Sequence, residues 1–186
     1  MQNAKGAREV CCYHLVMAQW LVKEEPDHYG YDQLVKDRKT VWAGVRNPLA
    51  QKHLRGIKRG DRIFYYHTGK EKAVVATAKA ASDAYADPAD ASGRMSVVEI
   101  VPDKKLTRPV TLAEIKGDKA FASFALVRMS RLSVMPVTDA EWERIEKLSR
   151  SGRSGRSARS GRSAESFSFS FWERRPRVRR TVRRIF

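Results

Sequence analysis

The sequence predicts a mixed α+β fold, in which a small β-barrel carries short flanking helices. Its 186 residues favour one domain with extensions, and a hydrophobic fraction of 42% is enough to form a core. Five or six short strand-like segments alternate with brief helical segments between residues 17 and 148. This order predicts a curled, mostly antiparallel sheet, which a small mixed barrel closes naturally.

The first elements are short and clearly separated. Residues 18–23 are apolar and are soon followed by a proline, which predicts a strand that ends there. Residues 31–36 place apolar side chains on one face, as a short helix does. Residues 40–45 contain a Trp and a Gly and form a strand or a loop. Asn47 followed by proline is typical of a helix start, so residues 49–54 are expected to be helical.

The middle of the chain is rich in strands. The segment 62–67 follows a Gly-Asp turn and contains mainly aromatic and β-branched residues, which predicts a strand. Residues 73–81 predict a second strand, apolar enough to be partly buried on both faces. Residues 82–93 contain Asp, Pro, Ser and Gly and predict a loop. Residues 94–101 alternate as a strand does.

Two helices with capping boxes flank the last strand. Residues 109–117 contain a helix-like segment with Thr111 at its start and a Glu three residues later. Residues 132–137 predict a short strand, and Pro136 places it at an edge or a bulge. Residues 138–148 give the clearest helix, again with Thr and Glu at capping-box spacing.

The positive charge is concentrated at one end of the chain. The formal net charge is +16, and residues 149–186 contribute +10 of it, from 12 Arg and 2 Glu. This segment is rich in Arg, Ser and Gly, which predicts a disordered tail. It is either a polyanion-binding tail with aromatic anchors or a low-complexity extension without a defined role, and we favour the second. Residues 1–16 are interpreted as an N-terminal extension of a domain that spans 17–148.

Cysteine usage and hydropathy indicate a cytoplasmic protein. Cys11 and Cys12 are the only cysteines, and adjacent cysteines rarely form a disulfide, which fits a reducing compartment. The apolar run 10–22 contains polar residues and lacks a small-residue cleavage site, so it does not favour a secretory signal. No stretch reaches the roughly 20 apolar residues that span a bilayer. We expect a monomer without a membrane partner.

No motif for catalysis is found in the sequence. The four histidines have no companion at metal-ligand spacing, and there is no phosphate loop, nucleophile elbow or zinc-deaminase motif. Glu24 and Glu25 are adjacent, so on a strand they point to opposite faces and make a poor acid–base pair. The sequence therefore predicts no catalytic residue, no metal and no cofactor, and a protein that is not an enzyme.

Aromatic, Arg, Asn and His residues gather in three segments, 20–26, 42–47 and 64–68. A pocket for a planar base needs such residues, because aromatic faces stack on the base and polar groups bind its edges or a phosphate. Trp and Tyr on strands are also commonly core residues. Composition alone therefore leaves both interpretations open.

Motifs in a fixed order decide between them, because the chain resembles the EVE domain family over residues 17–148. EVE domains resemble PUA and YTH domains in fold, so the resemblance implies a PUA-like barrel. The family is associated with nucleic-acid binding, in particular with modified bases flipped into a pocket. The motifs are Trp20–Pro26, Trp42–Pro48, Gly60-Asp61, Phe64–Gly69, Arg108–Leu112, Leu126–Arg128 and Arg131–Val137.

The resemblance implies which residues form the pocket. Trp42 would stack on the base, the alternative being a packed core Trp. Gly44 and Val45 would bring the backbone close to the base, or simply form a tight turn. Arg46 and Asn47 would make polar contacts at the pocket mouth, although Asn47 is also a candidate for helix capping alone.

Four further residues complete the site that the resemblance implies. Lys23, at the end of the first strand, would meet a phosphate, the alternative being a solvated lysine. Tyr66, His67 and Thr68 would line the far wall, with His67 as a hydrogen-bond partner. The alternative for His67 is a partly buried histidine with partners inside the protein.

The chain departs from the family pattern at two positions. Glu24 stands where family members commonly have Ser, and a carboxylate there would repel phosphate or alter which base modification fits. Leu49 replaces a Gln that is common after Asn-Pro, which removes an amide that could reach the ligand. Both departures concern the ligand and leave the fold unaffected.

We therefore interpret the chain as a nucleic-acid-binding module that captures one modified, flipped base of DNA or RNA in an aromatic pocket. Two alternatives stay open. The first is a PUA-like enzyme of the ASCH type that acts on modified nucleosides. The second is a non-catalytic scaffold that binds RNA or DNA only through its basic tail.

Overall fold

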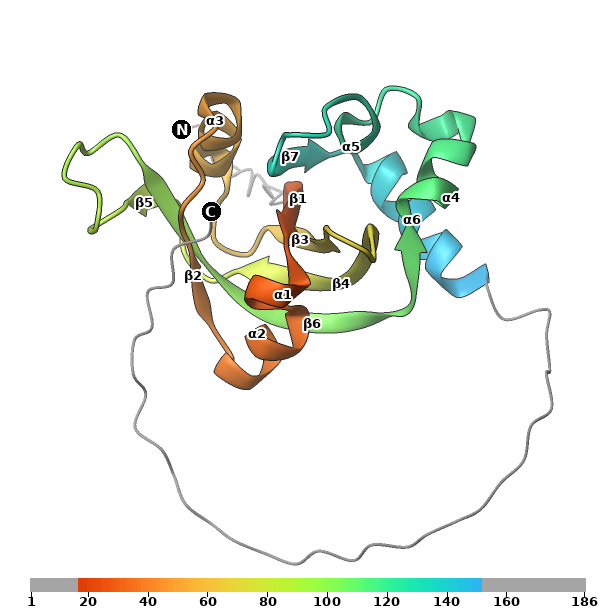
Figure 1. Ribbon diagram of the computed structural model, residues 1–186, viewed down its shortest axis with the longest axis horizontal. Helices are drawn as coiled ribbons and strands as arrows, with labels where there is room; N and C mark the ends of the chain where they lie inside the picture. Colours follow the sequence, from red (N-terminus) through yellow and green to blue (C-terminus); the bar gives the residue numbers. More distant parts are fainter. Residues whose placement is uncertain (1–16, 152–186) are drawn as a thin grey trace, which may run out of the picture.

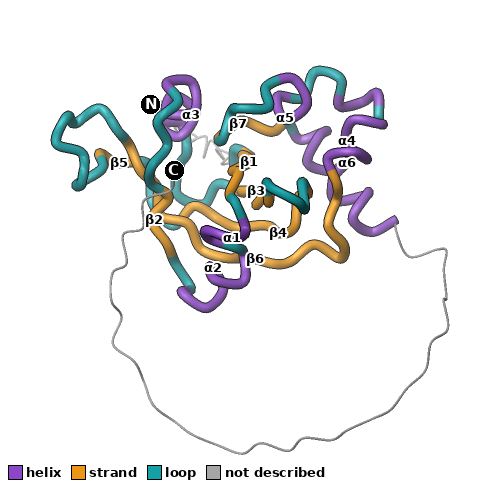
Figure 2. Tube along the Cα trace, viewed as in Figure 1, coloured by secondary structure: helices purple, strands orange, loops and turns teal. Residues whose placement is uncertain are grey.

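The computed structural model describes residues 17–151 and contains a seven-stranded sheet with helices at its periphery (Figures 1 and 2). The expected extension 1–16 and residues 152–186 of the expected tail lie outside the described residues. The strands are β1 (Gln19–Glu24), β2 (Thr40–Trp42), β3 (Arg62–His67), β4 (Ala73–Ala80), β5 (Tyr85–Ala86), β6 (Ser96–Thr111) and β7 (Val134–Val137). The helices are α1 (Pro26–Tyr29), α2 (Tyr31–Asp37), α3 (Pro48–Gly56), α4 (Leu112–Gly117), the short 3₁₀ helix η1 (Lys119–Phe121), α5 (Ala125–Arg128) and α6 (Asp139–Ser151).

The sheet is mostly antiparallel, as expected, and it curls into a half-barrel. The strands follow the order β2-β6-β4-β3-β1-β7, with β5 paired to β6. Among the described pairs β1 and β3 run parallel, and the others run antiparallel. Helix α3 contacts both β6 and β7, so it covers the side that the strands leave open (Figure 1). The mixed α+β class is confirmed.

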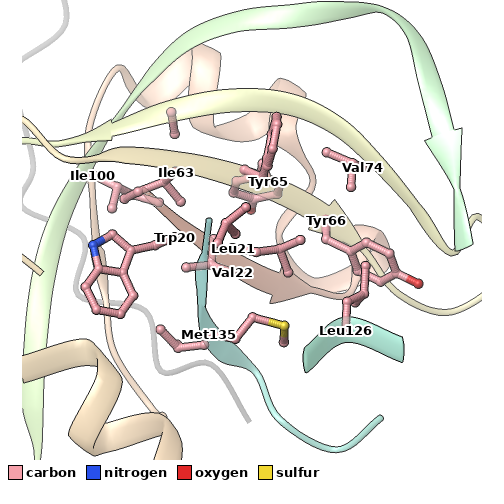
Figure 3. Packing of buried hydrophobic residues seen from close by; sticks show 14 of the residues in the cluster. Trp20, Leu21, Val22, Ile63, Tyr65, Tyr66, Val74, Ile100, Leu126 and Met135 are labelled. Carbon is pink, nitrogen blue, oxygen red and sulfur yellow. The ribbon is translucent and has the colours of Figure 1, made fainter. Parts of the chain in front are cut away.

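The core fills the concave side of this sheet. Figure 3 shows Val22 of β1 and Tyr65 of β3 packed together, with Ile100 of β6 and Met135 of β7 in the same cluster. Such close packing of β-branched and aromatic side chains supplies most of the stabilisation of a small barrel. Trp142 of α6 closes one end, where its ring stacks on Phe64 with centroids 3.7 Å apart.

The longest strand is twice the length that its sequence pattern predicts. β6 continues from Ser96 to Thr111, whereas alternation predicts a strand only for 94–101. Its second half is largely exposed and polar, so the apolar alternation that identifies a strand is missing there. Register shifts between β4 and β6 let the strand bend and still keep its pairing.

The capping boxes are confirmed at the helix starts. Thr111 and Glu114 bind each other's backbone N–H at α4, and Thr138 and Glu141 do the same at α6. Helix α6 runs to Ser151, beyond the expected domain end at 148. Short elements were not predicted: β5 lies in the expected loop 82–93, and α1, η1 and α5 have four residues or fewer.

Between residues 17 and 151, no helix combines the length and apolar character that crossing a bilayer requires. The cytoplasmic location stays a prediction.

Candidate functional site

A cavity of about 410 Å³ opens where the parallel strands β1 and β3 end. Four segments form its wall: the end of β1, the β2–α3 loop, the residue that follows β3, and the α5–β7 loop. The lining residues are Lys23, Glu24, Glu25, Trp42, Gly44, Val45, Arg46, Thr68, Ser130, Arg131, Leu132 and Ser133.

Backbone pairing brings three of these segments together. Because β1 and β3 are parallel, their carboxyl ends meet at one edge, and the Thr68 N–H donates to the Glu24 carbonyl oxygen at 2.8 Å. On the other side of β1, the Lys23 N–H donates to the Ser133 carbonyl oxygen at 2.9 Å. The Lys23 ammonium also donates to the Ser130 carbonyl oxygen at 3.0 Å, which holds the α5–β7 loop against the strand.

The β2–α3 loop has its own anchors. Gly44 has a φ of 81°, a left-handed conformation that a side chain disfavours, so this turn requires glycine. The Val45 carbonyl oxygen accepts a hydrogen bond from the buried Gln51 amide at 2.7 Å. Asn47 caps α3, because its side-chain oxygen accepts from the N–H groups of Leu49 and Ala50. The loop is therefore held at both ends.

Trp42 lies at the inner wall of the cavity and is almost fully buried. Only 1% of its surface is exposed, and its ring meets Tyr65 edge-on, with centroids 5.6 Å apart. A base in the cavity can therefore reach only a small part of the indole. The burial does not favour stacking across the whole ring.

Two titratable groups at the end of β1 are strongly affected by burial. Desolvation lowers the pKa of Lys23 to about 8. Desolvation also raises the pKa of Glu24 to about 7, and the neighbouring Glu25 charge acts in the same direction. Both groups therefore change charge close to physiological pH.

Glu24 is the buried acid of this site. The residue is 3% exposed, and its Oε1 atom accepts a hydrogen bond from the Glu25 N–H at 3.0 Å. Its Oε2 atom has no hydrogen-bond partner among residues 17–151. A buried polar atom without a partner is costly, so a ligand group that reached it would gain a hydrogen bond.

Six of the nine residues that the sequence predicts for the site line this cavity. They are Lys23, Trp42, Gly44, Val45, Arg46 and Thr68. Tyr66 instead packs beside Leu126 in the core (Figure 3), with the Lys23 ammonium 5.9 Å from its ring. Asn47 serves as the α3 cap. Their roles in binding stay predictions.

His67 lies away from the cavity and has partners inside the protein. Its Nε2 accepts from the Tyr31 N–H at 3.1 Å, and its Nδ1 lies 2.6 Å from Glu71 Oε2. It lines a second, smaller cavity of about 210 Å³ beside Tyr31 and Lys105. These contacts match the alternative interpretation, a partly buried histidine with its own partners.

Sequence reasoning missed half of the cavity wall. Glu24 and Glu25 were considered only as a poor catalytic pair and as a departure from a family pattern. The α5–β7 loop, Ser130–Ser133, had no assigned role. Its place at the site depends on the pairing of β7 with β1, which joins segments more than 100 residues apart.

Comparison with known proteins identifies the family. The EVE domain family model matches residues 18–148. The chain belongs to the EVE domain family. Its EVE domain is similar to the solution structure of Rpa0253 from Rhodopseudomonas palustris, with 46% identity and a TM-score of 0.68 over 71% of this chain and 92% of that one. This confirms the predicted PUA-like class.

The EVE domain also resembles thymocyte nuclear protein 1. The chicken (Gallus gallus) protein is 31% identical over 55% of this chain and 53% of that protein, and the human one is 27% identical over 56% and 58%. The chain thus spans little more than half the length of these relatives. A crystal structure of human THYN1 protein in complex with 5-methylcytosine-containing DNA is 26% identical, with a TM-score of 0.64 over 72% of this chain and 98% of that one.

Proposed function

We propose that this EVE domain binds DNA without altering it and captures one modified, flipped base in the cavity at the ends of β1 and β3. The observation that carries the proposal is the cavity itself, which combines Trp42 at its inner wall with Lys23, Arg46 and Arg131 around it. Its volume of about 410 Å³ falls within the usual range of small-ligand sites, roughly 300–1,000 Å³.

The structural relative supports the choice of ligand. Human THYN1 protein was crystallised with DNA that contains 5-methylcytosine, and its fold covers most of the described part of this chain. We therefore take 5-methylcytosine in DNA as the first ligand to examine. RNA is the alternative polymer that the same chemistry allows.

The charge arrangement fits a base that is still attached to its strand. Arg46 and Arg131 are exposed at the rim, where guanidinium groups pair with phosphate oxygens. Glu24 and the edge of Trp42 lie deeper, where a base edge would contact them. Flipping a base costs a few kcal/mol, so these inner contacts must offset that cost.

The proposal can be tested by filling the cavity. The full chain is mixed with oligonucleotides that carry either 5-methylcytosine or cytosine at one position, with unmodified competitor DNA present to occupy the basic segments. The change Thr68→Trp places a bulky ring in the cavity wall, and we expect it to abolish the preference for methylated DNA. Arg131→Ala should weaken binding to both oligonucleotides, because it removes a rim cation.

The control variant is Arg59→Ala, which removes the same charge from an exposed position that does not line the cavity. Thermal unfolding of each variant shows whether it is folded. An undiminished preference for 5-methylcytosine in folded Thr68→Trp would contradict the proposal.

A further inference from the structure

The cavity contains a buried acid, Glu24, of which only one carboxyl oxygen has a hydrogen-bond partner among the described residues. Glu24 lines the cavity, is 3% exposed, and has one carboxyl oxygen without a hydrogen-bond partner among the described residues. Its other oxygen accepts from the Glu25 N–H. The unpartnered oxygen, Oε2, is itself buried, so a ligand in the cavity reaches it when the Glu24 side chain turns toward the cavity.

The Glu25 contact decides which oxygen carries the proton when the carboxyl is neutral. An oxygen that accepts an N–H hydrogen bond remains an acceptor, so Oε1 is the carbonyl oxygen and the proton resides on Oε2. The neutral group therefore presents an O–H donor at Oε2 next to an acceptor with a spare lone pair at Oε1. Its two atoms are not interchangeable.

Cytosine presents the complementary pair of groups. Its N4 amino group is a donor, and the adjacent ring nitrogen N3 is an acceptor. In a pose with N4 at Oε1 and N3 at Oε2, both hydrogen bonds form. Thymine in the same pose places its O4 against Oε1 and its N3–H against the O–H group, so both contacts are repulsive.

We propose that Glu24 is the residue that selects the base, because as a neutral acid it binds the amino and ring-nitrogen edge of cytosine or 5-methylcytosine and rejects thymine. The inference rests on the proposed function and adds the chemical class of the base. The methyl group at C5 lies away from this edge. Glu24 therefore distinguishes amino bases from keto bases, and other parts of the cavity must recognise the methyl group.

The surroundings of Glu24 keep the neutral form accessible near pH 7. Burial raises the pKa of Glu24 to about 7, and the charge of Glu25 adds to this effect. The Tyr65 hydroxyl, on the neighbouring strand, is committed to the Tyr29 carbonyl oxygen at 2.7 Å. The Lys23 ammonium is committed to the Ser130 carbonyl oxygen.

Arg46 and Arg131 are the remaining charged groups of the cavity wall, and both are exposed at its rim. A carboxylate at Glu24 accepts hydrogen bonds but repels the N3 lone pair. Selection of cytosine should therefore fade as the pH rises through 7.

The test compares two bases that differ only at the edge in question. 5-Methylcytosine and thymine share the methyl group and differ at N3 and at the C4 substituent. Single-stranded oligonucleotides avoid any difference in base pairing. The quantity is the ratio of the two dissociation constants for the full chain, at pH 6 and at pH 8.5, with unmodified competitor present. Contributions from phosphate contacts and from Lys23 titration cancel in this ratio.

We expect the wild-type chain to prefer 5-methylcytosine by about 5- to 100-fold at pH 6, the range of a two-point base contact, and by much less at pH 8.5. Glu24→Gln carries an amide that does not titrate, and the Glu25 N–H holds its oxygen at the Oε1 position. Its NH₂ group then replaces the O–H donor, so the preference for 5-methylcytosine should be retained at both pH values. Glu143→Gln, an exposed residue of α6 outside the cavity, removes the same charge and should behave like the wild type.

The outcomes separate this inference from the proposed function. If Thr68→Trp abolishes binding of 5-methylcytosine but the wild-type ratio does not change with pH, the cavity binds a base and Glu24 does not select it. If neither oligonucleotide responds to Thr68→Trp, the proposed function fails and the inference fails with it.

Discussion

Glu24 and Lys23 are neighbours in sequence, and burial moves their pKa values toward each other. The pKa of the acid rises and the pKa of the amine falls, because desolvation disfavours the charged form of each. Each group is bound to a backbone atom: the Lys23 ammonium donates to the Ser130 carbonyl oxygen, and Glu24 Oε1 accepts from the Glu25 N–H. Titratable groups that are buried without an opposite charge as partner are typical of a binding site, and their desolvation lowers the stability of the fold.

The cost at Glu24 predicts a pH-dependent stability. The pKa of Glu24 is about 7 in the folded protein against an ordinary value of 4.5, so between these pH values the folded state binds more protons than the unfolded state. The free energy of unfolding therefore falls as the pH rises through this window, and the loss is complete above pH 7. Glu24→Gln should be more stable than the wild type by about 1–3 kcal/mol at pH 8 and similar to it near pH 4.5.

Denaturant unfolding of the two proteins across pH 4.5–8 measures this difference. Glu143→Gln serves as the exposed control and should follow the wild-type curve. Parallel curves for Glu24→Gln and the wild type would show that Glu24 is solvated in the folded protein.

Single residues of the site were predictable only in part. Trp42 and Arg46 were found because they belong to a continuous motif, and they do line the cavity. The orientation of His67 was not predictable, because its partners Tyr31 and Glu71 are set by how α2 and the β3–β4 turn pack. A motif identifies residues that are close in sequence, but it does not show on which side of a strand each side chain lies.

At the scale of elements, substitutions of Asn47 at the start of α3 can distinguish its structural role as a helix cap from a role in ligand binding. Asn47 accepts two backbone N–H groups there. Asn47→Ala should lower the free energy of unfolding by about 1 kcal/mol, because these helix-start donors lose their acceptor. Asn47→Ser keeps an acceptor and should retain most of the stability. A loss of DNA binding in the stable Ser variant would show that the Asn amide also contacts the ligand.

The junction of β1 with the turn before β3 depends on one buried acid. Asp61 accepts hydrogen bonds from the Trp20 indole at 2.8 Å and from the backbone N–H groups of Ala18 and Lys58. Asp61→Ala leaves all three donors without this acceptor and should cost about 2–4 kcal/mol, measured by chemical denaturation. Asp61→Asn keeps one carbonyl oxygen and should cost less. Equal stability of Asp61→Ala and the wild type would contradict this role.

Elements with a strong local signal were predicted well from the sequence. β3 matches its expected range, and the capping boxes of α4 and α6 are confirmed. The second half of β6 was not predictable, because its pairing with β4 across two register shifts depends on tertiary contacts and leaves polar side chains outward. Local patterns identify an element where burial alternates along it, and they fail where a strand is exposed.

At the scale of the whole molecule, charge and cavity should contribute separately to binding. Residues 152–186 carry 11 Arg and 2 Glu, so their removal lowers the net charge by nine. A chain that ends at Ser151 should bind unmodified DNA more weakly and with a smaller dependence on salt, because fewer counterions are released. Its ratio of affinities for 5-methylcytosine and cytosine oligonucleotides should remain that of the full chain.

Salt titrations of both chains, with circular dichroism to confirm folding, measure these two quantities. If the shortened chain shows no base preference at all, the interpretation of the protein as a scaffold that binds through its tail is favoured instead.

The parallel pairing of β1 with β3 has a consequence for how such a domain diversifies. The last residues of both strands lie at the same edge of the sheet, whereas Val22 and Tyr65, earlier in these strands, are buried in the core. A replacement at this edge, such as one at Glu24 or Thr68, therefore changes which ligand the cavity accepts and leaves the sheet intact. New ligand preferences can therefore be introduced at this edge one side chain at a time, while the sheet stays unchanged.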